Sequence, residues 1–366
     1  MKVLHVGEYV QGGVATYISL LLNHPNHPEI KDYLICADKN SQSTWDISDE
    51  RIYYYHYYRS ITQIPFAIYS IYKAIRDIQP DVVYCHSTWA GLFVRLPLFF
   101  LKKNFRIIYN AHGWSFLRDT SKWKRMVYAC VERVLQKKAD IIINVSKYEY
   151  ESAIAYGLEK NNQVVIYSGL SGEKGIIDSK IMLPKGKINI LYVGRFDSQK
   201  GLDILLEAFK ICNREDLHLT IIGDNVVGDG AKIEKINSEK ITFMGWVPHE
   251  KLASYYNACD VVVMPSRWEA FGLVAIEAMK YGKALIVSNK GALPELVQED
   301  VNGMIIDIDD KKSFKKTLER LRKDRLEYMG KKGLDMFHKM FLKEHMLEKT
   351  INLEKGNKSG AYKDLF

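Results

Sequence analysis

The sequence predicts an α/β protein built from two Rossmann-like, doubly wound domains that face a cleft. Short runs rich in Val and Ile alternate with longer amphipathic stretches, a pattern typical of parallel sheets covered by helices on both faces. This alternation occurs twice along a chain of 366 residues. Domains usually hold roughly 100–200 residues, so the length also suits two domains.

The first half supplies the elements of an N-terminal domain, which we assign to residues 1–180. Its predicted strands are KVLHV, DYLICA, RIYYYHY, DVVYCH, RIIYNAH, DIIINVS and QVVIYSG. Helical patterns such as VATYISLLLNH and KWKRMVYACVERVLQKK separate most of these strands.

The second half repeats the scheme in a C-terminal domain, residues 181–340. Its predicted strands are INILYVG, LTIIG, ITFMG, DVVVMPS, ALIVS and GMIIDI, and its helices include GLDILLEAFKICN, HEKLASYYNAC and GLVAIEAMKYG. A linker rich in Gly, Ser and Lys is expected near residues 171–187. The charged tail, residues 341–366, carries a helical stretch that we expect to pack back on the N-terminal domain.

The net charge of +8 is concentrated in one stretch. Residues 88–138 contain eleven Lys or Arg and two Asp or Glu, which gives +9, and apolar residues are interleaved with them. A solvated helix face explains this pattern, and so does a surface that meets anionic lipid headgroups. The chain shows no nucleic-acid-binding motif, so we expect no nucleic acid partner.

Cysteine usage and the N-terminus favour a cytoplasmic protein. No apolar run approaches the roughly 18 residues of a membrane span, and MKVLHVGE leads directly into a strand pattern with no signal peptide. The cysteines form no C-x-x-C pair, and each lies in an apolar segment, so we interpret them as small core residues. They are Cys36, Cys85, Cys130, Cys212 and Cys259.

Ligands of doubly wound sheets bind at the carboxyl ends of the strands, so the loop after each strand matters most. After the first strand, Gly12 and Gly13 open a helix whose backbone N–H groups can approach an anion. The stretch lacks the G-x-G-x-x-G fingerprint of nicotinamide enzymes, and a tight turn alone would also explain it.

The first strand of the second domain is followed by VGRFDSQKGLDILL. Arg195 and Lys200 bracket this turn, and Gly201 opens the helix. Two cations beside a helix N-terminus suit a dianion such as a diphosphate. An ordinary surface turn with two basic residues is the alternative.

The segment SRWEAFGLVAIEAM carries two glutamates eight residues apart. Glu269 lies at the mouth of the loop, and Glu277 lies five residues into the helix, roughly 7–8 Å deeper. Between them, the N–H groups of Phe271, Gly272 and Leu273 are expected to point into the cleft. The carboxylates can then accept hydroxyl groups at two ends of one elongated ligand. A solvent-facing Glu277 is the alternative.

Two further features complete the candidates. His112 ends a strand beside Gly113 and Trp114 at the expected cleft edge. A buried histidine whose hydrogen bonds are all made within the core would show the same pattern. The DID run at 307–309 is similar to a metal-binding D-x-D, but it follows a strand away from the other motifs. We interpret it as an ordinary turn and predict that no metal is required.

Together, GGVATY, GRFDSQKGLDILLEAF and the long segment from FMGWVPHEKL to NGMII resemble the retaining glycosyltransferases of family four, which have the GT-B fold. The pair Glu269/Glu277 matches the E-x7-E motif of that family. The resemblance is strong over residues 188–310 and looser over 1–170. One departure is YSGLSG at 167–172, where the family often has N-G-V-D, so no contact is transferred there.

The resemblance implies a nucleotide-sugar donor held mainly by the C-terminal domain, and an acceptor bound by the N-terminal domain. Arg195 and Lys200 would hold the diphosphate, Glu277 the ribose and Glu269 the transferred sugar, while His112 would lie near the anomeric carbon. The donor is expected to be a UDP-sugar that gives up a hexosyl or N-acetylhexosaminyl group, and no cofactor is expected.

The basic N-terminal surface favours a lipid-linked acceptor in bacterial surface polysaccharide synthesis, with the enzyme peripheral at the inner face of the membrane. A soluble acceptor and a non-catalytic sugar-nucleotide-binding partner are the alternatives.

Overall fold

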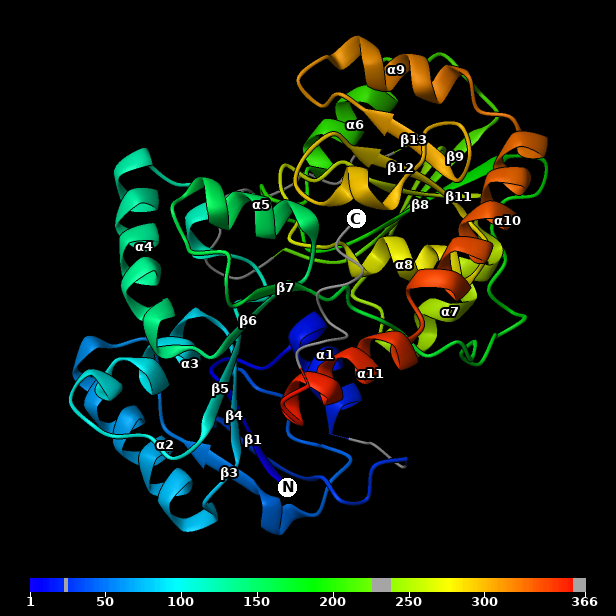
Figure 1. The fold of residues 1–366 in the computed structure, drawn as a ribbon. Coiled ribbons are helices and arrows are strands. Elements are labelled where there is room, and N and C mark those ends of the chain that lie inside the picture. The colour runs from blue at the N-terminus through cyan, green and yellow to red at the C-terminus, as the bar shows by residue number, and fades with distance from the viewer. Residues whose placement is uncertain (23–25, 226–237, 358–366) are drawn as a thin grey trace. The chain divides into compact units, whose positions relative to one another are not determined.

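The computed structural model describes residues 1–22, 26–225 and 238–357 (Figure 1). These residues form two compact units. One unit is Met1–Ser168 together with the C-terminal segment that begins at Glu344, and the other is Gly169–Lys343. Each unit is an α/β domain built on one parallel sheet.

The first unit contains a seven-stranded parallel sheet in the order β3-β2-β1-β4-β5-β6-β7. Its strands are β1 (Lys2–Gly7), β2 (Lys31–Ala37), β3 (Ile52–Tyr55), β4 (Val82–His86), β5 (Arg106–Asn110), β6 (Ile141–Asn144) and β7 (Gln163–Val165). Its helices are α1 (Gly12–Leu21), α2 (Ile64–Ile78), α3 (Thr88–Arg95), α4 (Lys122–Leu135), α5 (Lys147–Ala155) and α11 (Lys343–Glu354).

The second unit contains a six-stranded parallel sheet in the order β10-β9-β8-β11-β12-β13. Its strands are β8 (Ile188–Val193), β9 (Leu217–Ile222), β10 (Ile241–Gly245), β11 (Val261–Met264), β12 (Ala284–Ser288) and β13 (Gly303–Ile306). Its helices are α6 (Leu202–Lys210), α7 (His249–Ala258), α8 (Leu273–Lys280), α9 (Lys311–Glu319) and α10 (Lys323–Met340). The predicted strands and the doubly wound fold class are therefore confirmed.

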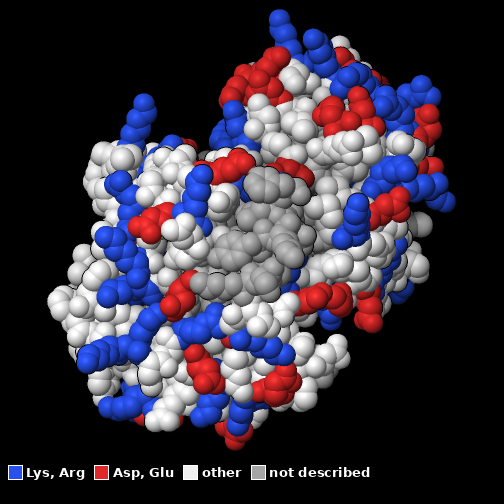
Figure 2. Space-filling model, viewed as in Figure 1, with Lys and Arg blue, Asp and Glu red and all other residues white. Residues whose placement is uncertain are grey.

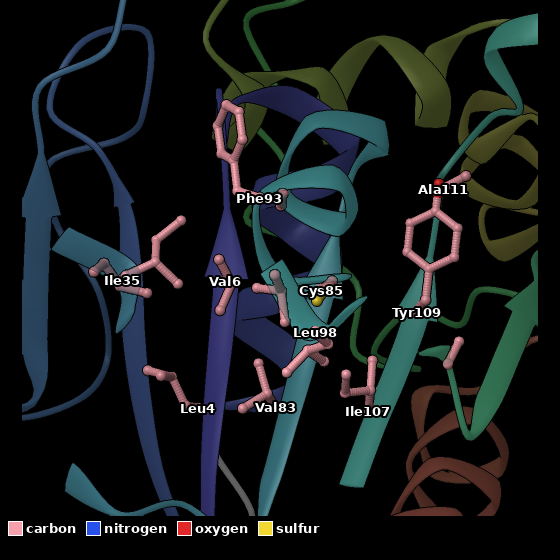
Figure 3. Close-up of a cluster of buried hydrophobic side chains, with 14 of the residues drawn as sticks. Leu4, Val6, Ile35, Val83, Cys85, Phe93, Leu98, Ile107, Tyr109 and Ala111 are labelled. Atoms are coloured by element: carbon pink, nitrogen blue, oxygen red, sulfur yellow. The ribbon is translucent and has the colours of Figure 1, made fainter. Parts of the chain in front are cut away.

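The strands are continuous apolar runs because helices cover both faces of each sheet. In the first unit, Val6, Cys85 and Tyr109 from three neighbouring strands share one face with Phe93 of α3 (Figure 3). On the opposite face, Val3 and Ile108 pack in a separate core with residues of α1 and α11. Alternate residues of one strand thus supply two different cores.

The C-terminal helix α11 packs on the first sheet. Arg106 of β5 donates hydrogen bonds to the carbonyl oxygens of Leu353 (2.8 Å) and Glu354 (3.0 Å). Ile351 and Leu353 are buried in the same core as Val3. These contacts bring α11 back to the domain in which the chain begins.

The division between the units lies at Ser168, slightly before the linker expected from composition. Leu170 forms a short parallel pairing with Leu342, just after α10. The Leu170 N–H donates to the Phe341 carbonyl oxygen at 2.9 Å, and the Lys343 N–H donates to the Leu170 carbonyl oxygen at 2.8 Å. This contact between distant segments ties residues 169–170 to the second unit.

Helix α4 is anchored by a buried ion pair. Arg95 of α3 and Glu132 of α4 are almost fully buried and lie 3.0 Å apart, and the Tyr109 hydroxyl donates to Glu132 at 2.8 Å. One edge of α4 is thereby fixed to the domain while its other side is exposed. Cys130 lies on that exposed side, so its assignment to the core was wrong, whereas the other four cysteines are buried.

Candidate active site

The central strands of the second sheet create the main site. Strands β8 and β11 are neighbours although they are not consecutive in the sequence, so the strand order reverses between them. In doubly wound sheets the ligand crevice lies at the carboxyl ends of such strands. Here the loops at that position are residues 194–201 after β8 and residues 265–272 after β11.

Two glycines let these loops approach one another and turn into helices. Gly201 (φ 66°) precedes α6 and Gly272 (φ 108°) precedes α8, and both have left-handed backbone that favours glycine. A Cβ atom on Gly201 would lie 2.1 Å from the Pro265 carbonyl oxygen. The Arg267 N–H also donates to the Gln199 carbonyl oxygen at 2.7 Å, so the two loops form one structure.

Within this structure, Lys200 and Glu269 form an ion pair. Lys200 Nζ lies 2.5 Å from Glu269 Oε1, and the Ser266 hydroxyl donates to the same oxygen at 3.1 Å. Glu269 is only 7% exposed, so it lies deeper than its position in the loop suggested. The loop after β12 fixes the backbone of Glu269, because the Ala292 N–H donates to the Glu269 carbonyl oxygen at 3.0 Å.

Arg195 lies in the loop after β8 and is more exposed than Lys200. Its guanidinium group is half exposed and lies 3.0 Å from Asp197 Oδ2, and it donates to Gln199 Oε1 at 3.3 Å. Asp197 also accepts from the Lys200 N–H at 3.0 Å. The structure thus brings Arg195 and Lys200 to one turn, where they and the N-termini of α6 and α8 can attract an anion.

Glu277 has a separate set of partners. The Tyr256 hydroxyl donates to Glu277 Oε2 at 2.6 Å, and His249 Nε2 lies 3.1 Å from Oε1. The hydrogen bond to Glu277 raises the pKa of His249. Burial, followed by the charge of Glu277, holds the pKa of the Tyr256 hydroxyl well above its usual range, so this hydroxyl remains a donor.

Sequence reasoning missed His249 and Tyr256. They are seven residues apart in α7, a spacing that places two side chains on one helix face. That spacing was a usable signal, but nothing in the sequence indicates that this face meets α8.

The remaining candidates of the second unit lie at the start of α8. Phe271 is buried, and its ring contacts Phe341 edge-on with 5.9 Å between centroids. Phe271 therefore packs inside the unit, whereas Leu273 is partly exposed in the first turn of the helix. Their backbone N–H groups belong to the turn that Gly272 opens.

In the first unit, Gly12 and Gly13 begin α1 after β1. Gly12 has φ 57°, and a Cβ atom there would meet nothing within 4 Å, so its backbone conformation is what favours glycine. Tyr17, one turn further along α1, places its ring edge-on to the His112 ring, with centroids 4.7 Å apart. The first turns of α1 therefore lie near His112.

His112 follows β5 and has left-handed backbone, with φ 51°. Its N–H donates to Asn110 Oδ1 at 2.9 Å, and its Nε2 atom lies 3.1 Å from Nδ1 of His86. Burial lowers the pKa of His112 to about 3, so its imidazole is neutral at pH 7. A strained, partly exposed residue at the end of a strand is a candidate for function.

No group of three or more His, Cys, Asp and Glu side chains in the described part of the chain is arranged to hold a metal ion. Asp307 and Asp309 of the DID run bond to neighbouring side chains, Asn289 and Lys290. None of the helices in the described residues is long and apolar enough to cross a membrane.

Comparison with protein families gives two matches that together span most of the chain. Residues 11–173 match the family described as Glycosyltransferase Family 4, and residues 173–336 match the one described as Glycosyl transferases group 1.

Individual proteins agree with these matches. An uncharacterized 41.2 kDa protein in the cps region of Klebsiella pneumoniae is 38% identical over 85% of this chain and 87% of its own length. The UDP-Gal:alpha-D-GlcNAc-diphosphoundecaprenol alpha-1,3-galactosyltransferase of Escherichia coli is 26% identical over 71% of each chain. Sucrose-phosphate synthase of Thermosynechococcus elongatus has the same fold, with a TM-score of 0.83 and 20% identity over 97% of this chain and 98% of its own.

Proposed function

Because this chain belongs to the family 4 glycosyltransferases and has their GT-B fold, we propose that it transfers a sugar from a UDP-sugar to an acceptor with retention of anomeric configuration. The observation that carries the proposal is the cluster of Lys200, Glu269 and Ser266 at the carboxyl ends of β8 and β11, with Arg195 beside it. The Escherichia coli relative named for UDP-Gal supports a UDP-linked donor.

In the proposed reaction, the diphosphate binds at the turn that carries Arg195 and Lys200. The bond between the anomeric carbon and the diphosphate oxygen breaks, and negative charge grows on the leaving oxygen. The two cations and the N-termini of α6 and α8 stabilise this charge, and they do so most strongly in the transition state. The acceptor hydroxyl attacks from the same face, and its proton passes to the departing phosphate.

The carboxylates of Glu277 and Glu269 are proposed to contact different parts of the donor. Glu277 accepts hydrogen bonds from the ribose, and Glu269 accepts one from a hydroxyl of the transferred sugar. A carboxylate that accepts from hydroxyl groups forms a charge-assisted contact that depends on geometry. His112 is proposed to hydrogen-bond the sugar near the anomeric carbon, as the family resemblance implies.

The acceptor in this proposal is a lipid-linked glycan used to build a bacterial surface polysaccharide. The Escherichia coli relative is named for a sugar carried on diphosphoundecaprenol, and the Klebsiella pneumoniae relative is named for its place in a cps region. An enzyme with such an acceptor works at a membrane surface, and we place it at the cytoplasmic face.

The exposed side of α4 supports this placement. Trp123, Val127, Val131 and Val134 recur at helical spacing and are exposed, with Trp123 at 65%. Lysine and arginine side chains lie among these apolar atoms, as the region of α4 in Figure 2 shows. Cations attract anionic headgroups by about 1 kcal/mol for each Lys or Arg near the surface, and the apolar side chains can then enter the interface.

Vesicle co-sedimentation tests this surface. The wild type should bind anionic vesicles at low salt and bind less as salt rises, because the Debye length shrinks from about 10 Å at 0.1 M to about 3 Å at 1 M. The variant with Lys122, Lys124 and Arg125 changed to Glu should stay in the supernatant.

A matched control reverses three charges elsewhere, with Lys331, Lys332 and Lys339 of α10 changed to Glu. These residues are exposed and belong to the second unit, so this control should bind like the wild type. Equal binding by the α4 variant, or equal loss in both variants, would contradict a specific membrane face on α4.

The activity itself is tested in two steps. Thermal shift should first identify a stabilising nucleotide, since a ligand at 100 times its dissociation constant stabilises by about 2.7 kcal/mol. Release of UDP from a panel of UDP-sugars is then measured with diphosphoundecaprenol-linked sugars and with soluble sugars. Turnover only with soluble acceptors would remove the lipid-linked acceptor, and binding without any turnover would favour a non-catalytic partner.

A further inference from the structure

Four polar side chains form a continuous hydrogen-bonded chain across the first sheet. Asp32 lies on β2, His5 on β1, His86 at the end of β4, and His112 just after β5. This is also the order of the strands in the sheet, β2-β1-β4-β5. Each residue therefore meets the next one across a single strand spacing, although they are far apart in the sequence.

The contacts between these side chains have hydrogen-bond distances throughout. His5 Nε2 lies 3.2 Å from Asp32 Oδ1, His86 Nε2 lies 3.0 Å from His5 Nδ1, and His112 Nε2 lies 3.1 Å from His86 Nδ1. His5 and His86 are fully buried, and Asp32 is nearly so. Both nitrogen atoms of the two inner imidazoles are thus used within the chain.

The direction of these hydrogen bonds follows from Asp32, the carboxylate at one end of the hydrogen-bonded series. A carboxylate only accepts, so Asp32 requires the proton of His5 on Nε2. The Nδ1 atom of a neutral His5 is then an acceptor, so His86 must carry its proton on Nε2. By the same reasoning, Nδ1 of His86 is an acceptor, so His112 must also carry its proton on Nε2. Burial, with the neighbouring imidazoles, holds the pKa of His86 well below its usual range, so this ring is neutral at pH 7.

We propose that Asp32, His5 and His86 are positioning residues that fix the tautomer of His112. His112 carries its proton on Nε2, directed at His86, and its Nδ1 atom is an acceptor for a hydroxyl group of the bound sugar. The assignment of Nδ1 to a sugar hydroxyl rests on the glycosyltransferase function proposed above, whereas the tautomer itself does not.

The surroundings of the chain favour a fixed direction. Tyr84 stacks on His86 with 4.1 Å between ring centroids, and its hydroxyl bonds to that of Tyr17 at 2.9 Å. Glu354 of α11 is also buried nearby, and burial together with the charge of Asp32 holds its pKa well above the usual range.

The direct test is NMR of protein with 15N-labelled histidine, which reports the protonated nitrogen of each ring and the coupling across each N–H···N hydrogen bond. We expect His5, His86 and His112 all to carry the proton on Nε2, with couplings across both imidazole–imidazole contacts. A proton on Nδ1 of His112, or no coupling between His86 and His112, would overturn the proposal. This measurement needs no substrate, so it fails or succeeds independently of the proposed function.

Three variants test whether the chain acts through His112. His86→Gln can still accept from His112 and donate to His5, whereas His86→Phe breaks the chain. We expect His86→Phe to lower turnover about tenfold, the size of one lost hydrogen bond, with UDP affinity unchanged, and His86→Gln to recover most of that loss. Tyr84→Phe removes a neighbouring hydroxyl but keeps the stacking, and serves as the control for stability. Equal turnover in the two His86 variants at matched melting temperature would overturn the role of the chain.

Discussion

The ion pair between Lys200 and Glu269 predicts an unusual response of UDP binding to a change at Glu269. Lys200 Nζ and Glu269 Oε1 are 2.5 Å apart, and the Glu269 side chain is buried. If Lys200 also holds the diphosphate, its ammonium group divides its donors between Glu269 and the phosphate oxygens. Glu269→Gln keeps the shape of the side chain but removes its charge, so Lys200 becomes fully available to the ligand.

The magnitudes follow from the contacts. A hydrogen bond to a charged group contributes roughly 1.5–3 kcal/mol. Partial release of Lys200 should therefore leave UDP affinity unchanged or raise it by up to about tenfold, which corresponds to about 1.4 kcal/mol. Turnover should fall about 10- to 100-fold, because the sugar hydroxyl loses a charged acceptor.

Isothermal titration with UDP and a UDP-release assay separate these two effects. Glu277→Gln is the matched control, since Glu277 has different partners, Tyr256 and His249, and is assigned to the ribose. It should weaken UDP binding and turnover together. If Glu269→Gln loses as much UDP affinity as Glu277→Gln at an unchanged melting temperature, the division between sugar and nucleotide is refuted.

Three further predictions address the other parts of the structure. Arg195→Ala and Lys200→Ala should each lower turnover more than UDP affinity, and wild-type activity should survive a chelator; loss in chelator that a divalent ion restores would contradict this. Glu132→Ala leaves Arg95 buried without its partner and should cost about 3–5 kcal/mol in urea unfolding, and a cost under about 1 kcal/mol would count against the buried pair. His249 has a raised pKa, so the stability that it adds over His249→Gln should be present below its ordinary pKa of 6.5 and lost as pH rises through the raised value. Melting temperatures of both proteins from about pH 5 to about pH 9 measure this, and a constant difference would refute it.

The sequence predicted the strands well because each is a continuous apolar run with buried faces on both sides. Once the strands were predicted, the loops of the candidate site could be predicted too, because a doubly wound sheet places ligands where its strands end. Partners were harder to predict. Lys200 and Glu269 are 69 residues apart and meet only because β8 and β11 are neighbours in the sheet. Local patterns identify which residues end a strand, but the strand order decides which of those residues come together.

The histidine chain illustrates the same limit. His5 and His86 lie inside strands that look uniformly apolar, and a lone buried histidine in such a strand gives no signal in one sequence. The contact between Leu170 and Leu342, which sets the division between the units, likewise depends on where α10 ends in space. These features depend on contacts between distant segments, which periodicity and composition do not encode.

The two units differ in the charge of the candidate groups at the carboxyl ends of their strands. In the second unit, the loops beside the reversal of strand order carry Arg195 and Lys200 together with two helix N-termini, an arrangement suited to an anion. In the first unit, His112 follows β5, one strand beyond the reversal between β1 and β4, and burial lowers the pKa of its imidazole to about 3, so the ring is neutral. A neutral ring whose tautomer is fixed distinguishes hydroxyl groups by direction and does not attract a diphosphate. The neutral ring of His112 therefore suits the proposed contact with a sugar hydroxyl, and the cationic turn of the second unit suits the proposed contact with the diphosphate.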